Sequence, residues 1–403
     1  MQAVDVIIIG GGLVGLTLAL ALKDTGLTAA VIEGQMPDGH VPEIPDNRVS
    51  AINLASQTLL ERLGAWPGQG ERLGPYSEME VWEADSFGRI HFSAQEVQQP
   101  RLGHIVENNL LQQSLLAAAR ASGHIRLHMP ARASKMAAGE QGVFVLLEDG
   151  TPITGRLLVG ADGARSSVRE QLNPGLVEWD YDHAALVATI NTAEPHDQTA
   201  RQIFRGQEIL AFLPLADAHQ CSIVWSCPPE RAEELTRMDD AAFNKALSHA
   251  FDLRMGLCRV LGPRQSIPLR ARYSKQFCGP RWALVGDAAH TVHPLAGQGV
   301  NLGLLDAAAL AETLGKTQAK GGDIGQYDQL KRFERWRKAE AATLLAAMEA
   351  LKRLFGVRLP LAPVIRGLGL GITNSLPQVK RVFAEHALGT SGQLPGLCQP
   401  EKN

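Results

Sequence analysis

A glycine-rich hexapeptide, Gly10-Gly11-Gly12-Leu13-Val14-Gly15, lies near the start of the chain. It follows a β-branched apolar run, Val4 to Ile9, and opens a stretch of helical composition, Leu13 to Asp24. A second apolar run, Thr28 to Ile32, comes next. Strand, glycine loop, helix and strand in this order predict a βαβ unit, which requires a parallel sheet. The sequence therefore predicts an α/β fold that begins with a Rossmann-like unit.

The glycines of this unit have the spacing of a dinucleotide-binding loop. Gly10 allows a tight turn, Gly12 lets a pyrophosphate approach the backbone, and Gly15 permits close helix packing, while the helix N-terminus carries partial positive charge. Glu33 ends the second strand, where its carboxylate can accept hydrogen bonds from a ribose. A carboxylate there repels a 2′-phosphate, so the site favours FAD or NAD over NADP. A tight turn without a ligand is the simpler alternative, which the flanking strands disfavour.

Two further motifs carry an aspartate directly after a short apolar strand. Gly160-Ala161-Asp162-Gly163-Ala164-Arg165-Ser166 follows Leu157 to Val159, and Gly286-Asp287-Ala288-Ala289-His290 follows Trp282 to Val285. Ligand-binding groups of α/β sheets lie at such strand ends. Each motif alone is also compatible with an Asx turn.

The three motifs together resemble those of the class A FAD-dependent aromatic hydroxylases, the para-hydroxybenzoate hydroxylase-like family. The resemblance implies that FAD is the cofactor. It also implies that Asp162 and Gly163 lie near FAD and the path of the pyridine nucleotide, and that Gly286 and Asp287 contact its ribityl and pyrophosphate groups. No second G-x-G-x-x-G follows a strand, so NAD(P)H is expected to dock only transiently as electron donor.

The resemblance extends to other residues around the flavin. The stretch from His293 to Asn301 matches the family's loop beside the isoalloxazine, where backbone N–H groups stabilise negative charge on the reduced ring. Arg48 matches an arginine that reaches FAD, and Asn108 matches a flavin-contacting amide; a surface arginine and a helix cap are the alternatives. The predicted cofactor-binding residues are Gly10, Gly12, Leu13, Val14, Gly15, Glu33, Arg48, Asn108, Asp162, Gly163, Gly286, Asp287, Pro294, Gly297, Gly299, Val300 and Asn301.

The resemblance is closest to the ubiquinone-biosynthesis hydroxylases, and within them to the VisC-type 2-octaprenylphenol (C5) hydroxylases. The matching stretches include RVSAIN from Arg48, GHIVEN from Gly103 and the run from Gly286 to Gly303. It implies a monooxygenase that uses O2 to convert 2-octaprenylphenol to 2-octaprenyl-6-hydroxyphenol through a C4a-hydroperoxyflavin. The flavin carries the chemistry, so no catalytic side chain is named; Pro294, Gly297 and Gly299 line the ring.

Three alternatives to this function remain open. They are a sister hydroxylase acting at another ring carbon, a flavin-dependent prenyl reductase on the same fold, and a scaffold that retains FAD for stability.

Composition and charge exclude several other classes of function. With 39 basic and 42 acidic residues the net charge is -3, which gives no basic excess for nucleic acid. The five cysteines are odd in number and form no Cys-x-x-Cys pair, so no disulfide framework or zinc cluster is predicted. His290 and His293 lack a third ligand at suitable spacing, and no metal is expected. A cytoplasmic protein fits best.

The 403 residues are expected to form two or three structural units. We predict a discontinuous FAD-binding domain (residues 1–75, 100–180 and 276–340), interleaved with a β-rich substrate domain (76–99 and 181–275) and followed by a C-terminal helical region (341–403). The substrate is expected between the first two. Glu230 to Phe251 is predicted to be helical, and strands are predicted on either side of turns at 85–88 and 149–150.

The C-terminal region has a basic, apolar stretch from Ala350 to Ala384. It contains Lys352, Arg353, Arg358, Arg366, Lys380 and Arg381 but no acidic residue. Such a segment is expected to contact an anionic membrane surface or a protein of a ubiquinone-biosynthesis complex, or to cover the core with a solvated basic face. No stretch reaches the length of a membrane span, and a homo-oligomer remains open.

Overall fold

A parallel sheet forms the centre of the computed structural model, which describes residues 2–37, 39, 42–68, 72–84, 88–291, 298–356 and 388–400. Its parallel strands run in the order β21-β13-β2-β3-β9, with β20 antiparallel at one edge. Their bounds are β2 Val6–Ile9, β3 Ala29–Ile32, β9 Ile125–His128, β13 Leu157–Gly160, β20 Cys278–Gly279 and β21 Trp282–Leu284. The predicted βαβ unit and α/β class are confirmed.

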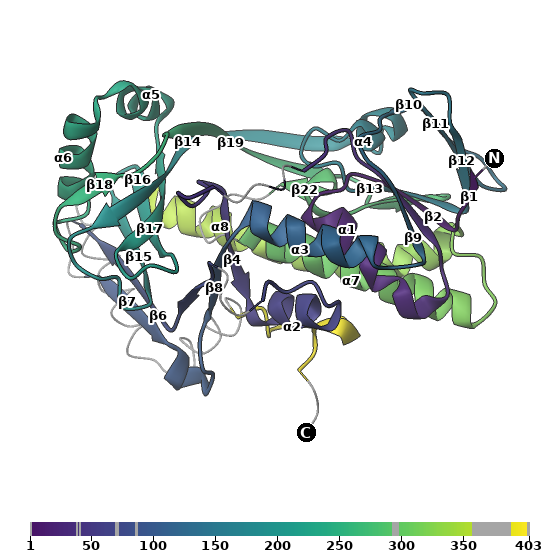
Figure 1. Ribbon diagram of the computed structural model, residues 1–403, viewed down its shortest axis with the longest axis horizontal. Helices are drawn as coiled ribbons and strands as arrows, with labels where there is room; N and C mark the ends of the chain where they lie inside the picture. Colours follow the sequence, from purple (N-terminus) through teal and green to yellow (C-terminus); the bar gives the residue numbers. More distant parts are fainter. Residues whose placement is uncertain are drawn as a thin grey trace.

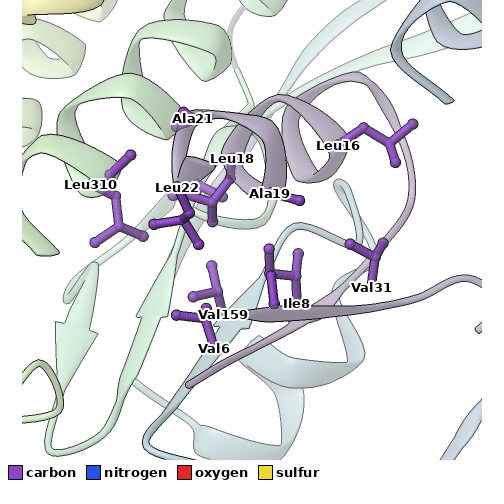
Figure 2. Packing of buried hydrophobic residues seen from close by; sticks show 14 of the residues in the cluster. Val6, Ile8, Leu16, Leu18, Ala19, Ala21, Leu22, Val31, Val159 and Leu310 are labelled. Carbon is purple, nitrogen blue, oxygen red and sulfur yellow. The ribbon is translucent and has the colours of Figure 1, made fainter. Parts of the chain in front are cut away.

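Helices cover one face of this sheet. α1 (Leu13–Ala21), α3 (Asn108–Arg120) and α7 (Gln298–Ala319) pack there, and Figure 2 shows Leu18 and Leu22 of α1 and Leu310 of α7 close to Val6 and Val159 of the sheet. The smaller sheet β1-β12-β11-β10 covers the other face. Its strands are β1 Gln2–Ala3, β10 Ala133–Ala138, β11 Val143–Leu147 and β12 Pro152–Gly155. The central strands are thus buried on both faces, which is why they read as continuous apolar runs.

The β-rich part of the chain forms one large sheet, at the left of Figure 1. The strand order is β22-β19-β14-β17-β16-β15-β6-β7, with β18 paired to β14. The bounds are β6 Glu78–Glu83, β7 Arg89–Ser93, β14 Leu176–Thr192, β15 Thr199–Arg205, β16 Glu208–Pro214, β17 Gln220–Cys227, β18 Cys258–Val260, β19 Gln265–Ser274 and β22 His290–Thr291. β14 and β19 run from this sheet to the FAD-binding part (Figure 1), so the predicted domain boundary at residue 180 falls inside β14.

Two helices cover the outer face of the large sheet, in the stretch predicted to be helical. They are α5 (Pro229–Arg237) and α6 (Asp240–Ala250). The chain breaks between them because the Asp239 carboxylate accepts a hydrogen bond from the Ala242 N–H (2.8 Å) and caps α6. The predicted strand pair at 143–159 also differs, since β12 intervenes. Of the predicted turn at 85–88, residues 85–87 lie outside the described residues.

A third small sheet joins the two parts of the molecule. It has the order β4-β8-β5; β4 leads into α2 (Leu54–Arg62), and β8 leads into α3. Its strands are β4 Val49–Asn53, β5 Gly74–Tyr76 and β8 Gly103–Glu107. Its apolar residues Ala51 and Ile105 pack with Ala200 of the large sheet, so this sheet fixes how the FAD-binding part meets the β-rich part.

The C-terminal region is only partly helical. α8 (Tyr327–Gly356) is followed by 357–387, which lie outside the described residues, and 388–400 form turns with one 3-10 turn, Gly396–Cys398. The prediction of helix is therefore wrong for 388–400, which pack on the FAD-binding part. The Arg62 guanidinium donates to Gly396 O (2.7 Å) and the Trp336 indole to Gln393 O (3.0 Å). Within the described part of the chain, no helix has the length and apolar character to span a membrane.

Candidate functional site

The glycine loop between β2 and α1 has one position that faces open space. A Cβ added to Gly10, whose φ is +109°, would lie 2.3 Å from Ala161 O, and one added to Gly15 would lie 2.0 Å from Gly10 O. Neighbouring backbone therefore accounts for these two glycines. A Cβ on Gly12 would meet nothing within 4 Å. Gly12 is also the N-cap of α1 and provides no side-chain acceptor, so the first N–H groups of the helix lack a side-chain partner.

This geometry fits the pyrophosphate of FAD. A helix N-terminus with free N–H groups attracts an anion, and a missing side chain at Gly12 lets the anion approach the backbone. Leu13 and Val14 are partly buried at the start of α1, against the core. The loop thus has the open space and the donors that the sequence predicted.

Glu33 lies beside the glycine loop at the end of β3. Its carboxylate accepts hydrogen bonds from the N–H groups of Gly11 (2.8 Å) and Gln35 (2.9 Å). The side-chain amide of Gln112 on α3 donates to Gly11 O (3.0 Å). Each carboxylate oxygen still has acceptor capacity for a ribose hydroxyl. Gln112 was not predicted, because a glutamine in a helix carries no recognisable pattern.

Asp162 has a local structural role. Its carboxylate accepts hydrogen bonds from the Ser166 hydroxyl and from the N–H groups of Ser167 (2.7 Å) and Val168 (3.2 Å), and so caps α4 (Ser167–Leu172). The backbone N of Asp162 lies 2.8 Å from the position of a Cβ on Gly10. Gly163 has a φ of +78° and open space at its Cβ position. The second motif therefore packs directly onto the glycine loop, as predicted for a shared site.

Arg169, which the sequence did not single out, joins the second motif to the third. Its guanidinium is buried and donates to Ala164 O (2.7 Å) and Ala288 O (2.8 Å). Burial lowers the pKa of Arg169, with a further contribution from Arg272. In the sequence, an arginine in a short polar helix is indistinguishable from a surface residue.

The third motif packs against the first. Gly286 begins the 3-10 turn Gly286–Ala288 with a φ of +61°, and an added Cβ would lie 3.1 Å from a methyl group of Val14. Asp287 is exposed by surface area, yet desolvation by surrounding protein raises its pKa against the opposing effects of His290, Arg48, Arg272 and Arg169. Arg48 is thus one of the positive charges that act on the Asp287 carboxyl, which is consistent with the prediction that both residues belong to one site.

Replacement of Asp287 by asparagine is expected to have opposite effects on stability and cofactor binding. A carboxyl whose pKa is raised on folding disfavours the folded state above its pKa and has no effect well below it. The Asp287→Asn apo-protein is therefore expected to melt above the wild type at pH 7, with the difference vanishing as the pH falls towards about 4, near the usual pKa of Asp. FAD affinity should fall by about tenfold, the equivalent of one charge-assisted hydrogen bond.

Thermal melts across this pH range and FAD titration of the apo-protein measure both effects. A variant that melts below the wild type at pH 7, or that binds FAD as tightly, contradicts this placement of Asp287.

Arg48 and Asn108 lie together where β4 and α3 begin. Arg48 is exposed, and its carbonyl accepts a hydrogen bond from Asn108 N (2.9 Å). The Asn108 side-chain oxygen accepts a hydrogen bond from the Ser50 hydroxyl (2.6 Å). Glu107, not Asn108, is the N-cap of α3, so the helix-cap alternative for Asn108 is wrong.

The loop predicted beside the flavin is described only at its end. Pro294, Gly297 and His293 lie outside the described residues. Gly299, Val300 and Asn301 form the first turn of α7, and the buried Asn301 amide donates to Ala51 O (2.7 Å) and accepts from Asn53 N (3.1 Å). The Asn301 side chain therefore ties α7 to β4, and its direct contact with FAD stays a prediction. Among the described residues no three His, Cys, Asp or Glu side chains gather as a metal site.

Comparison with known proteins places this site in a family. Residues 3–346 match the family model described as "FAD binding domain". The chain is 36% identical over 389 residues to the ubiquinone hydroxylase UbiL of Rhodospirillum rubrum, an alignment that covers 96% of this chain and 90% of that protein. The chain belongs to the FAD-dependent aromatic hydroxylases. It is an FAD-dependent monooxygenase, and FAD is its cofactor, with O2 and NAD(P)H the usual co-substrates of this class.

One further relative and one solved structure extend this comparison. The 3-demethoxyubiquinol 3-hydroxylase of Escherichia coli is 36% identical over 391 residues, covering 96% of this chain and 99% of that protein. Among solved structures, Pseudomonas aeruginosa PqsL in complex with 2-aminobenzoylacetate superposes with a TM-score of 0.77 at 23% identity, covering 92% of this chain and all of that one. This last likeness shows the shared fold.

Proposed function

We propose that this hydroxylase acts on the aromatic ring of a polyprenylphenol in ubiquinone biosynthesis, converting 2-octaprenylphenol to 2-octaprenyl-6-hydroxyphenol at ring carbon C5. The observation that carries the proposal is the similarity over 96% of the chain to relatives named as ubiquinone hydroxylases. A relative named only as a ubiquinone hydroxylase and a relative named as a 3-demethoxyubiquinol 3-hydroxylase are equally similar to this chain, at 36% identity. The choice of ring carbon therefore rests on the resemblance of particular sequence stretches to the VisC-type enzymes.

The protein's own part in the reaction is to hold FAD and orient the phenol. The open position at Gly12 and the N-terminus of α1 would hold the pyrophosphate, Glu33 the ribose, and Asp287 the ribityl chain. Bound FAD, once reduced, supplies the activation of O2 and the transfer of one oxygen atom to the ring. No catalytic side chain is required in this scheme, so substitutions are expected to act through binding and positioning.

The face of the large sheet opposite α5 and α6 offers an apolar surface for the substrate. Cross-strand neighbours on this face are Val81, Gln202, Ala211, Val224 and Val187. Four of them are only partly buried, whereas the alternate residues of the same strands lie in the core beneath α5 and α6. Four apolar side chains and one amide suit a prenylated ring that carries a single hydroxyl. We place the substrate between this face and the FAD-binding part.

We also propose peripheral contact of the basic segment Ala350 to Ala384 with an anionic membrane or with a biosynthetic complex, as a route for the prenyl tail. The segment lies mostly outside the described residues. Residues 388–400 pack on the core beyond it, so a truncation after α8 would remove this packing together with the segment. Replacement of Lys380 and Arg381 by serine, followed by sedimentation with anionic vesicles, tests the contact without that loss.

The function is tested by the intermediate that accumulates in cells lacking this protein while O2 is present. We expect 2-octaprenylphenol, and its hydroxylated product when the purified holoenzyme receives NAD(P)H and O2. Accumulation of a later, methoxylated intermediate would assign the protein to a sister step at another ring carbon. Oxidation of NADPH without O2 consumption would indicate a prenyl reductase, and a protein that holds FAD but forms no hydroxylated product would indicate a scaffold.

A further inference from the structure

A buried carboxylate lies directly behind the third motif. Asp306, on α7, is fully buried, and its two oxygens bind three donors from three other places in the chain. One oxygen accepts from the Gly286 N–H (3.0 Å) and binds the His290 Nε2 (2.6 Å), and the other accepts from the Arg337 Nε (2.7 Å). His290 and Arg337 are each 1% exposed at the side chain. We call Asp306, His290 and Arg337 the Asp306 network.

The Asp306 network contains a buried cation, Arg337, and a buried anion, Asp306. The Arg337 guanidinium is a permanent cation, and it and His290 hold the pKa of Asp306 below its usual value although burial opposes this. Asp306 is therefore an anion that can only accept hydrogen bonds, so His290 must carry a proton on Nε2. Burying such an ion pair generally gains little stability over apolar packing. A role in geometry explains its presence better than a role in stability.

Two donors of the Asp306 network lie on either side of Asp287, the predicted cofactor contact, in the sequence. Gly286 and His290 stand on either side of Asp287, and both are bound to the same carboxylate on α7. The first turn of the helix that carries Asp306 contains Gly299 and Val300, which are both predicted cofactor-binding residues. Arg337 comes from α8, next to Trp336, whose indole binds the C-terminal segment. The network thus fixes the turn that carries Asp287 relative to both α7 and α8.

We propose that Asp306 is a positioning residue for FAD: through the Gly286 N–H and His290 it holds the Asp287 turn in the conformation that takes the cofactor, and Arg337 holds Asp306 in place from α8. The proposal rests on the FAD site and is independent of which phenol is hydroxylated.

The test compares cofactor affinity with stability in matched variants. Asp306→Asn leaves Arg337 as an unpaired buried cation, so it should lower the melting temperature. The double variant Asp306→Asn with Arg337→Gln removes both charges and should recover much of that loss. For a positioning role, both proteins bind FAD about tenfold or more weakly, measured by flavin fluorescence on the apo-protein. The double variant reports on the proposal even where the single one fails to fold.

Asp323→Asn is the matched control. Asp323 binds the Arg281 guanidinium (2.6 Å) and the Gly325 N–H (3.1 Å), so it is also a carboxylate shared by an arginine and a glycine. Its partner Arg281 directly precedes β21, so Asp323 lies at the amino-terminal ends of the parallel strands. The cofactor motifs lie at the opposite, carboxyl-terminal ends. We expect a lower melting temperature with unchanged FAD affinity. Wild-type affinity in the double variant, or equal loss of affinity in the Asp323 variant, would overturn the proposal.

Discussion

A Gly12→Val variant is expected to fold and to purify without FAD. Every other position of the loop's glycine triplet touches protein: a Cβ on Gly10 would meet Ala161, and one on Gly11 would meet Met129 and Glu33 at 2.4 and 2.8 Å. Of these three glycines, only Gly12 has a Cβ position with no atom of the described chain within 4 Å. The valine side chain fills this space without disturbing α1, so it should exclude the pyrophosphate and little else.

The expected loss of FAD affinity is about 100-fold or more, since contacts of the pyrophosphate with several N–H groups at the helix N-terminus would be lost together. The readout is the melting temperature with and without added FAD. A ligand that binds only the folded protein raises it, by about 2.7 kcal/mol of stability at 100 times Kd. The wild type should show this shift and the variant should not.

Valine substitutions at two other glycines serve as controls for this experiment. Gly123, in the turn before β9, also has open space at its Cβ position, so Gly123→Val should leave both the fold and the response to FAD intact. Gly15→Val should prevent folding, because its Cβ would collide with Gly10 O at 2.0 Å. A Gly12→Val protein that retains stoichiometric FAD would contradict the placement of the pyrophosphate.

The sequence predicted the parts of the site in which local pattern determines structure. The loop at Gly10 to Gly15 and the turns at Asp162 and Asp287 follow short apolar strands, and parallel strands bring such turns to one edge of a sheet. The sequence could not show that the Glu33 carboxylate also binds the Gly11 N–H, because that contact depends on how β3 lies beside the loop. A Glu33→Lys substitution would therefore disturb the loop as well as the predicted ribose contact.

Residues that act over long distances were missed for a physical reason. Asp306 binds groups 20, 16 and 31 residues away, and Arg169 binds carbonyls 5 and 119 residues away, so no local pattern marks either contact. Asp306 did leave a signal, since it is an acid in the apolar run Leu304 to Leu310. A charged side chain on a buried helix face requires a partner of opposite charge or hydrogen-bond donors. This rule would have identified Asp306 as a residue with such partners.

Two errors in the predicted fold have different origins. The β-rich domain was expected to resume at residue 181, but its strand β14 already starts at Leu176, because a register shift between Asp180 and Ala184 interrupts the alternation that marks a strand. The helix predicted through residues 388–400 ignored Ser391, Gly392, Pro395 and Gly396, which disfavour helix. Tertiary contacts with α2 and α8 hold that segment instead.

Replacement of Arg169 by methionine is expected to destabilise the apo-protein by about 2–4 kcal/mol. The methionine keeps the volume of the stem but removes the donors to Ala164 O and Ala288 O, and each buried, charge-assisted hydrogen bond of this kind contributes about 1.5–3 kcal/mol. The net loss is smaller than the sum of the two, because the apolar side chain no longer pays the desolvation cost of a buried charge. Without the guanidinium, the carbonyl oxygens of Ala164 and Ala288 would each lose this hydrogen-bond donor inside the protein. Because these carbonyls belong to the second and third motifs, the two turns should lose their fixed relation and FAD affinity should fall as well.

Urea unfolding of the apo-protein measures the free energy, and Arg237→Met is the matched control. Arg237 pairs with Glu233 on the surface of α5, with both side chains largely exposed, so its loss should change the free energy of unfolding by less than about 0.5 kcal/mol. Arg169→Lys adds a finer comparison, because one ammonium group lacks the fork geometry that reaches two carbonyls at once. Its stability should lie between those of the wild type and the methionine variant. An Arg169→Met protein as stable as the Arg237 control would mean that the two motifs hold their positions without this guanidinium.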